Sequence, residues 1–201
     1  MNNQYNIWNK WDPLKTVVLG DTYKPSFYKD IKDKNIKDAL LRICDETHED
    51  LDYYESVLKD FGCTVIRPEI DPNDNIMNYV REDGRLTNKN PGGVPKPPLM
   101  PRDKQFVIGN NLVYTADDKG DCWIKLLDQY NNSDVIDIRR EKQIDAPCYT
   151  VVGRDLYIDL MDSNLPDLHK HKLLKKTKDV RLNYLRVGGH NDGCFHTIKP
   201  G

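Results

Sequence analysis

Residues 106–114 read FVIGNNLVY and residues 150–158 read TVVGRDLYI. In both stretches three apolar or β-branched residues precede a glycine and two polar residues, and apolar residues follow. This pattern predicts a β-hairpin with a tight turn. Gly109 and Gly153 are 44 positions apart (153 minus 109), a spacing within the range of repeated supersecondary units. The two stretches therefore predict a fold built from a repeated module that contains a hairpin.

The rest of the module follows each predicted hairpin. After the first hairpin, the periodicity predicts a helix over residues 121–130 and a strand over 135–138. After the second, it predicts a helix over residues 165–176 and a strand over 180–187. The predicted module is hairpin, helix and strand, and it occurs twice.

The N-terminal part predicts a β-α-β unit. Residues 14–20, LKTVVLG, are typical of a strand, and residues 64–68, TVIRP, of a strand that ends at proline. Between them, apolar residues recur every three or four positions over residues 38–61, which predicts an amphipathic helix that ends at Gly62. This order places a helix on one side of a sheet.

The segment of about residues 69–102 is rich in proline, glycine and asparagine, so we expect no long regular element there. A loop of this length inside a domain is either functional or disordered.

Composition excludes several classes of function. The net charge is −2 and the pI is about 6.2, which predicts neither a nucleic-acid-binding nor a membrane-binding surface. The N-terminal residues do not resemble a signal peptide. The five cysteines form no CxxC pair; they are Cys44, Cys63, Cys122, Cys148 and Cys194. Unclustered cysteines of odd number are typical of reduced thiols in a cytoplasmic protein.

Polar residues precede each predicted hairpin. Asp103 stands before the first hairpin and Asp145 before the second, while His190 and Asp192 precede a possible third at residues 194–199. Equivalent positions in repeated modules would bring these side chains together. Carboxylates beside a histidine suit a planar cation such as a guanidinium, which carboxylates bind in a bidentate manner. The same carboxylates would adjust the histidine for acid/base work.

Simpler interpretations stay open for each residue. Asp103 and Asp145 are also typical turn residues. If the chain is extended after the glycine pair, His190, Asp192 and Cys194 share one face, and Cys194 would lie near a base. A cysteine in an apolar strand is, however, more often a small buried residue, and the same holds for Cys148.

Cys44 and His48 are four residues apart on the predicted helix, as a metal-binding pair could be. No further ligand pair with zinc-like spacing follows, so a buried thiol is the favoured interpretation. The sequence predicts no metal and no cofactor.

Nine segments stand out along nearly the whole chain; they are WNKWDPL (8–14), VVLG (17–20), MPRD (100–103), VIGN (107–110), IDA (144–146), GRD (153–155), HND (190–192), Phe195 and PG (200–201). In sequence and in order, these segments resemble those of the amidinotransferase branch of the guanidino-group-modifying, or pentein, superfamily. The chain resembles glycine amidinotransferases most of all.

The resemblance implies an α/β propeller of β-β-α-β modules, in which residues 1–201 form one partial domain of about three modules. It implies transfer of an amidino group from L-arginine to an amine acceptor such as glycine, through a thioether on a cysteine. Carried over by position, His190 is the acid/base residue and Asp145 its acidic partner. Asp103 and Asp192 are then the carboxylates that bind the guanidinium.

Two departures from the family affect this expectation. Cys148 stands where the family usually has a second acid. The family's nucleophilic cysteine and a carboxylate-binding arginine lie beyond the position that matches Gly201. We therefore expect the chain alone to be inactive, and to associate with another copy or with a complementary C-terminal part. The alternatives are an arginine deiminase-type hydrolase, which uses water as the acceptor, and a non-catalytic fragment that binds a guanidino ligand.

Overall fold

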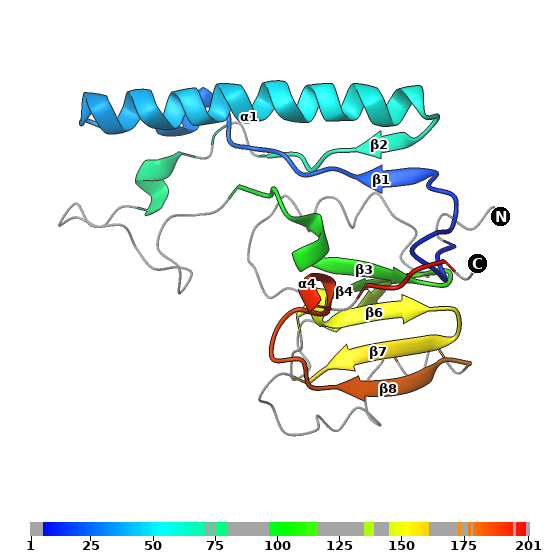
Figure 1. Cartoon of the computed structure of the whole chain (residues 1–201). Helices are drawn as coiled ribbons and strands as arrows, with labels where there is room; N and C mark the ends of the chain where they lie inside the picture. The colour runs from blue at the N-terminus through cyan, green and yellow to red at the C-terminus, as the bar shows by residue number, and fades with distance from the viewer. Residues whose placement is uncertain are drawn as a thin grey trace. The chain divides into compact units, whose positions relative to one another are not determined.

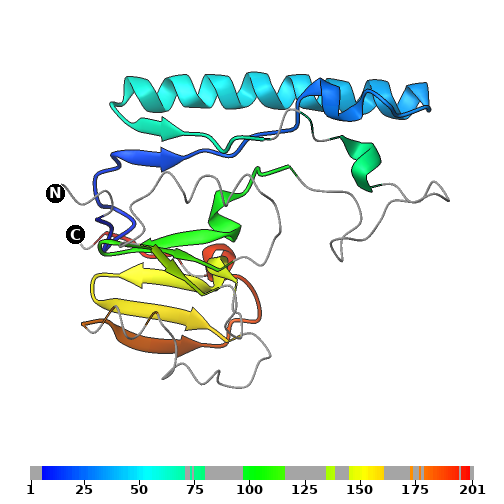
Figure 2. The same cartoon turned by 180° about the vertical axis from the view of Figure 1, so that it is seen from behind.

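The computed structural model describes residues 6–70, 73, 75–79, 97–115, 135–138, 145–160, 173, 177, 179–194 and 196–199 (Figures 1 and 2). The described residues form two compact units. Unit 1 contains residues 6–13, 102–115 and the described residues from 135 onward, and unit 2 contains those between 14 and 101. The prediction of a single domain stays a prediction.

Unit 2 is the predicted β-α-β unit. Strand β1 (Thr16–Val18) pairs in parallel with β2 (Thr64–Ile66), and helix α1 (Lys34–Asp60) connects them and lies along the pair (Figure 1). The helix begins four residues before the predicted start, because the Asp33 carboxylate accepts hydrogen bonds from the backbone N–H groups of Asn35 and Ile36. Such N-caps satisfy donors that have no partner within the helix.

The end of α1 is where the sequence predicts it. Gly62 has a φ of +82°; its N–H donates to the Lys59 carbonyl, and the Cys63 N–H donates to the Leu58 carbonyl. This pair of bonds is the Schellman motif, which favours glycine because a side chain strains a left-handed backbone.

The core of unit 2 lies beside α1. Tyr23 stacks on Phe27 with ring centroids 3.9 Å apart. The other core members come from two short 3₁₀ turns, η1 (Pro25–Tyr28) and η2 (Ile76–Tyr79), and from α1; they are Tyr28, Ile76 and Cys44. Of the predicted loop at 69–102, residues 71–72, 74 and 80–96 lie outside the described residues.

Unit 1 confirms the predicted repeat. Strands β3 (Gln105–Ile108) and β4 (Asn111–Tyr114) form the first hairpin, and β5 (Val135–Asp137) pairs in parallel with β4. Strands β6 (Tyr149–Val152) and β7 (Asp155–Asp159) form the second hairpin, and β8 (Arg181–Leu185) pairs in parallel with β7. The predicted helix at 121–130 lies outside the described residues, as does that at 165–176 except for buried, helical Leu173.

The two hairpins have the same register. Gln105 pairs with Tyr114 in the first, and Tyr149 pairs with Ile158 in the second. Both members of the pair shift by 44 positions (149 minus 105, 158 minus 114). The two sheets pack on one shared apolar core, which includes Ile108, Val113, Ile136, Leu156, Ile158 and Leu173.

A short N-terminal segment joins the two hairpin turns. Ile7 forms an antiparallel bridge with Gly109, and the Gly153 N–H donates to the Trp8 carbonyl at 2.7 Å. The Trp8 indole packs on Gly109, and the Arg154 guanidinium carbon lies over it, 3.8 Å from the ring centroid. This segment therefore fixes the two repeats at their turn ends.

The prediction of a third hairpin is wrong. Residues Asn191–Cys194 form a helical turn, α4, and the described residues 196–199 contain no strand. The helical turn begins at Asn191, whose side chain is fully buried and donates to the backbone carbonyls of Cys148 and Tyr157. These two bonds anchor the segment to the second hairpin, and the Gly193 N–H closes the turn on the His190 carbonyl at 3.1 Å.

Candidate active site

A turn directly before β6 is the centre of the candidate site. Residues 145–149, here named the Asp145 turn, contain the 3₁₀ helix η5 (Ala146–Cys148), whose residues are fully buried or nearly so. Asp145 begins the turn, is exposed, and its carboxylate makes no capping hydrogen bond. The Cys148 N–H donates to the Asp145 carbonyl at 2.9 Å.

The two other predicted motifs meet at this turn. Arg102 donates from Nη1 to the Ala146 carbonyl at 2.5 Å and from Nη2 to the Tyr149 carbonyl. Asn191 donates from Nδ2 to the Cys148 carbonyl at 2.6 Å. Arg102 is the residue before Asp103, and Asn191 separates His190 from Asp192. The residues next to each candidate site residue therefore converge on one turn.

Arg102 is itself a half-buried cation. Its guanidinium carbon lies 5.9 Å from the centroid of the Phe106 ring, and Phe106 stacks on Tyr149 with centroids 4.6 Å apart. Burial lowers the pKa of Arg102, and the carboxylates of Asp192 and Asp103 oppose that shift. Arginine remains protonated under such shifts.

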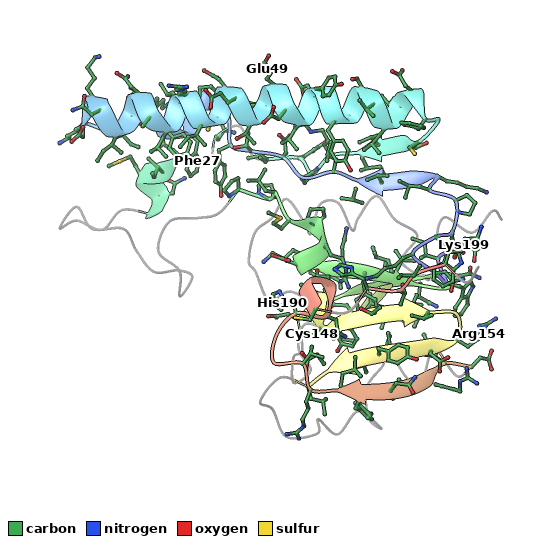
Figure 3. The ribbon with its side chains drawn as sticks, in the orientation of Figure 1. Phe27, Glu49, Cys148, Arg154, His190 and Lys199 are labelled. Carbon is green, nitrogen blue, oxygen red and sulfur yellow. The ribbon has the colours of Figure 1, made fainter. Side chains whose placement is uncertain are left out.

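A buried carboxylate holds the loop that leads to His190. Asp159, at the end of β7, is fully buried and accepts hydrogen bonds from the Val187 N–H at 3.4 Å and the Gly189 N–H at 3.2 Å. Gly188, with a φ of +76°, allows the loop to turn back there. His190 then stands exposed at the entrance to α4, and Figure 3 shows His190 and Cys148 at the same end of the second hairpin.

The carboxylates near the Asp145 turn shift the pKa values of other groups. Burial and then the charges of Asp145, Asp159 and Asp192 raise the pKa of the Cys148 thiol to about 11, and Arg102 opposes them. Burial and the charge of Arg102 lower the pKa of Lys10, while Asp192 raises it. Asp192 thus acts on three groups that come from separate parts of the chain.

The charges of Asp103 and Asp192 both raise the pKa of Arg102, and the charges of Asp145 and Asp192 both raise the pKa of Cys148. None of these three aspartates forms a side-chain hydrogen bond or an ion pair with another described residue. The His190 ring likewise contacts no other described residue through such a bond; it joins the group through its place beside Asn191.

Cys148 is buried, as the sequence favours, whereas Cys194 is exposed and is not the buried residue that the sequence favours. A thiol with a pKa near 11 is protonated at neutral pH, so Cys148 is a poor nucleophile. Cys194 is exposed on α4, and the expectation that it shares a strand face with His190 is wrong because residues 191–194 are helical.

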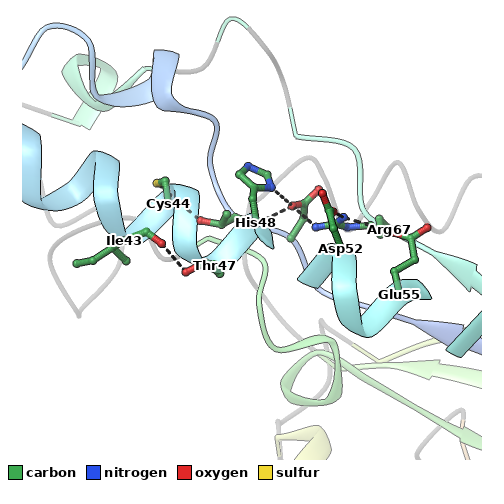
Figure 4. A network of polar contacts seen from close by, with 9 residues as sticks. Ile43, Cys44, Thr47, His48, Asp52, Glu55 and Arg67 are labelled. Atoms are coloured by element: carbon green, nitrogen blue, oxygen red, sulfur yellow. Dashed lines mark hydrogen bonds and ion pairs between the residues drawn. The ribbon is translucent and has the colours of Figure 1, made fainter. Parts of the chain in front are cut away.

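Unit 2 contains a separate polar network (Figure 4). Cys44 is buried, 3.9 Å from the Thr22 hydroxyl, and the His48 Nδ1 lies 3.6 Å from a carboxylate oxygen of Asp21. Arg67 pairs with three carboxylates, those of Asp21, Asp52 and Glu55. These pairs connect the end of β2 with α1. No group of three or more His, Cys, Asp or Glu side chains among the described residues could hold a metal ion.

Sequence reasoning missed Arg102, Asn191, Asp159 and Lys10. Arg102 and Asn191 lie inside motifs that the sequence indicates, but the sequence assigns no role to either residue. A polar residue in the middle of a motif is the signal that could have identified them, because burial there demands hydrogen bonds.

Two solved structures show the fold. One is SxtG, an amidinotransferase of the saxitoxin biosynthetic pathway from Microseira wollei, with a TM-score of 0.59, 16% identity, and coverage of 90% of this chain and 62% of that one. The other is the inosamine-phosphate amidinotransferase StrB1 from Streptomyces griseus, with a TM-score of 0.60, 18% identity, and coverage of 95% and 66%.

This chain therefore has the α/β fold of the amidinotransferases, as the sequence resemblance predicts, and it spans less than two thirds of the length of either protein. No family model and no curated protein matches the sequence. Among the described residues, no helix combines the length and the apolar character that a membrane crossing requires.

Proposed function

We propose that the carboxylates around the Asp145 turn bind the guanidinium group of L-arginine, and that the site serves amidino transfer to an amine such as glycine. The observation that supports the proposal is that Arg102 and Asn191, the sequence neighbours of Asp103 and Asp192, both donate hydrogen bonds to the turn that Asp145 begins, while none of the three aspartates forms an ion pair with a described residue. Carboxylates that are exposed or partly exposed and have no cationic partner favour a cationic ligand, and carboxylates bind a guanidinium in a bidentate manner.

The proposed roles follow from exposure and surroundings. Asp103 and Asp192 accept hydrogen bonds from the N–H groups of the guanidinium. The Arg102 cation does not block them, because its Nη atoms already donate to backbone carbonyls. His190, which is exposed directly before α4, transfers protons, and Asp145 is its acidic partner.

The reaction has two halves. A thiolate attacks the guanidinium carbon, the ornithine amine leaves with a proton from His190, and an amidino thioether remains. The glycine amine then attacks the same carbon, gives its proton to His190, and releases the thiolate. Cys148 does not supply this thiolate, because its thiol is protonated at neutral pH. We therefore expect the chain alone to bind arginine without turning it over.

The test is incubation of the pure chain with L-arginine and glycine, with products separated by chromatography. The expected result is arginine binding with neither guanidinoacetate nor citrulline formed. Steady formation of guanidinoacetate that is lost in Cys194→Ser would identify Cys194 as the nucleophile and overturn the expectation of inactivity. Citrulline in place of guanidinoacetate would assign a hydrolase, and the absence of arginine binding at millimolar concentration would remove the proposal.

A further inference from the structure

The side chains that organise the candidate site are different from those that would touch a ligand. Three carbonyls of the Asp145 turn, those of Ala146, Cys148 and Tyr149, accept hydrogen bonds from side chains outside the turn. Two residues supply all of these donors, Arg102 and Asn191. They are separated from the turn by 44 and 43 positions (146 minus 102, 191 minus 148).

Each donor is adjacent in sequence to a candidate ligand-binding residue. Any movement of Arg102 moves Asp103, and any movement of Asn191 moves both His190 and Asp192. The Asp145 carboxylate in turn depends on the turn itself, since the Asp145 carbonyl receives the Cys148 N–H. Three motifs from three parts of the chain are therefore held in one arrangement by hydrogen bonds to one turn.

The chemistry of both residues suits a fixed role. The guanidinium of Arg102 is a rigid fork that donates to two carbonyls at once, which lysine cannot reproduce. Asn191 is fully buried and its amide donates to the carbonyls of Cys148 and Tyr157. Its Oδ1 has no partner among the described residues. Burying a polar group in this way is costly, and the bonds to the turn are what offset that cost.

We propose that Arg102 and Asn191 are positioning residues, which assemble Asp103, Asp145, His190 and Asp192 into one guanidinium-binding site by fixing the Asp145 turn. This inference rests on the proposed function for the identity of the ligand. The assembly itself can be tested without a ligand.

The first experiment measures the affinity of the folded protein for L-arginine by NMR titration, well below the unfolding temperature. Arg102→Met should weaken binding about tenfold or more, because a small displacement of binding groups has large effects. Arg102→Lys keeps the charge but loses the two-pronged donor, so its affinity for L-arginine should lie between that of Arg102→Met and that of the parent protein. Asn191→Leu should weaken binding to a similar extent, and Asn191→Ser, which keeps a donor, should do so less.

Arg154→Met is the matched control. Arg154 also lies over an aromatic ring, that of Trp8, but at the opposite end of the second hairpin from Cys148 (Figure 3). Its loss should lower the unfolding temperature while the affinity for L-arginine stays within about twofold. Equal loss of affinity in Arg154→Met and Arg102→Met would show a merely structural effect and overturn the proposal.

The second experiment needs no ligand, and it separates this inference from the proposed function. Hydrogen exchange of the Cys148 amide, which is bonded to the Asp145 carbonyl, reports opening of the turn. It should accelerate about tenfold or more in Arg102→Met and Asn191→Leu, and stay unchanged in Arg154→Met. If the parent protein binds no arginine but this pattern holds, the proposed function fails and the positioning role stands. Unchanged exchange in both variants would overturn the positioning role.

Discussion

At the scale of single residues, the environment decides the chemistry more than the residue type does. Cys148 and Cys194 are both candidate nucleophiles by type, yet one is buried among carboxylates and the other is exposed on a short helical turn. Gly109 and Gly153, at equivalent places in the repeat, likewise differ in what surrounds them. In each pair, one residue serves as the control for the other.

The first prediction concerns the pH dependence of stability. The pKa of Cys148 is raised from an ordinary value of 9.0 to about 11, so the native state keeps a proton that the unfolded state releases. The stabilisation is therefore complete below about pH 9 and is lost as the pH rises toward 11. Raising the pH from 8 to 10.5 should therefore lower the free energy of unfolding by about 2 kcal/mol through the ionisation of this thiol in the unfolded state.

Urea unfolding of the parent and of Cys148→Ala at both pH values measures this loss. The variant is less stable at pH 8, but its stability should fall less steeply with pH. Parallel pH dependence in the two proteins would contradict the protonated, buried thiol. As a companion measurement, iodoacetamide should label Cys194 in the native protein and spare Cys148, because only the first of these thiols is exposed.

The second prediction compares Gly109→Ala with Gly153→Ala. Both glycines have a left-handed backbone, with φ of +54° and +57°, which costs about 1 kcal/mol for alanine. A methyl group at Gly109 would also overlap the Trp8 indole, whereas the space at Gly153 is open. Gly109→Ala should therefore cost at least about 1 kcal/mol more than Gly153→Ala. Equal costs in denaturant unfolding would show that Trp8 does not pack on Gly109.

At the scale of elements, the sequence predicts correctly those elements that nearby residues determine. The hairpins, the parallel strands after them, and the end of α1 at Gly62 could be predicted because turn glycines and apolar periodicity determine them within a few residues. The third hairpin could not. The conformation of residues 190–194 depends on bonds from Asn191 to carbonyls more than 30 positions away, and no local pattern reports a partner at that separation.

In the candidate site too, local sequence patterns could predict only part of the arrangement. The residues that carry charge could be identified from the motifs, since acids stand before each hairpin. The residues that hold the site together could not, because Arg102 and Asn191 act through backbone carbonyls, which every residue has. For the same reason, the difference between Cys148 and Cys194 required the structure.

The third prediction belongs to α1. Asp33→Ala removes the side chain that caps the first turn and should cost about 1 kcal/mol of unfolding free energy. Asp38→Ala is the control, because it removes only an exposed pair with Lys34 at 3.0 Å and should cost about 0.5 kcal/mol or less. Circular dichroism during urea unfolding measures both. A larger cost for Asp38→Ala would contradict the capping role.

At the scale of the whole molecule, the described surface of unit 1 includes exposed apolar side chains in the C-terminal region. Tyr184 on β8, Val187 and Ile198 are all exposed, and Ile198 is 87% accessible. We propose that this region takes part in self-association, as exposed apolar side chains favour contact with another chain.

The fourth prediction is a concentration-dependent mass by light scattering, which should be reduced when both Val187 and Ile198 are replaced by serine. Replacement of Phe61, an exposed apolar residue that follows α1 in unit 2, is the control and should leave the mass unchanged. A monodisperse monomer at high concentration in the parent protein would contradict this association.

We propose that Asp103 and Asp192, which are 89 positions apart (192 minus 103), bind the same guanidinium group. The most direct test is isothermal titration of L-arginine into the parent chain and into the double variant Asp103→Asn/Asp192→Asn. Asp179→Asn, an exposed acid of unit 1, is the control for removal of negative charge. We expect the parent to bind arginine, the double variant to lose at least about tenfold in affinity, and the affinity of the control to stay within about twofold. Equal affinity in all three proteins would contradict this proposal, as would the absence of binding to the parent.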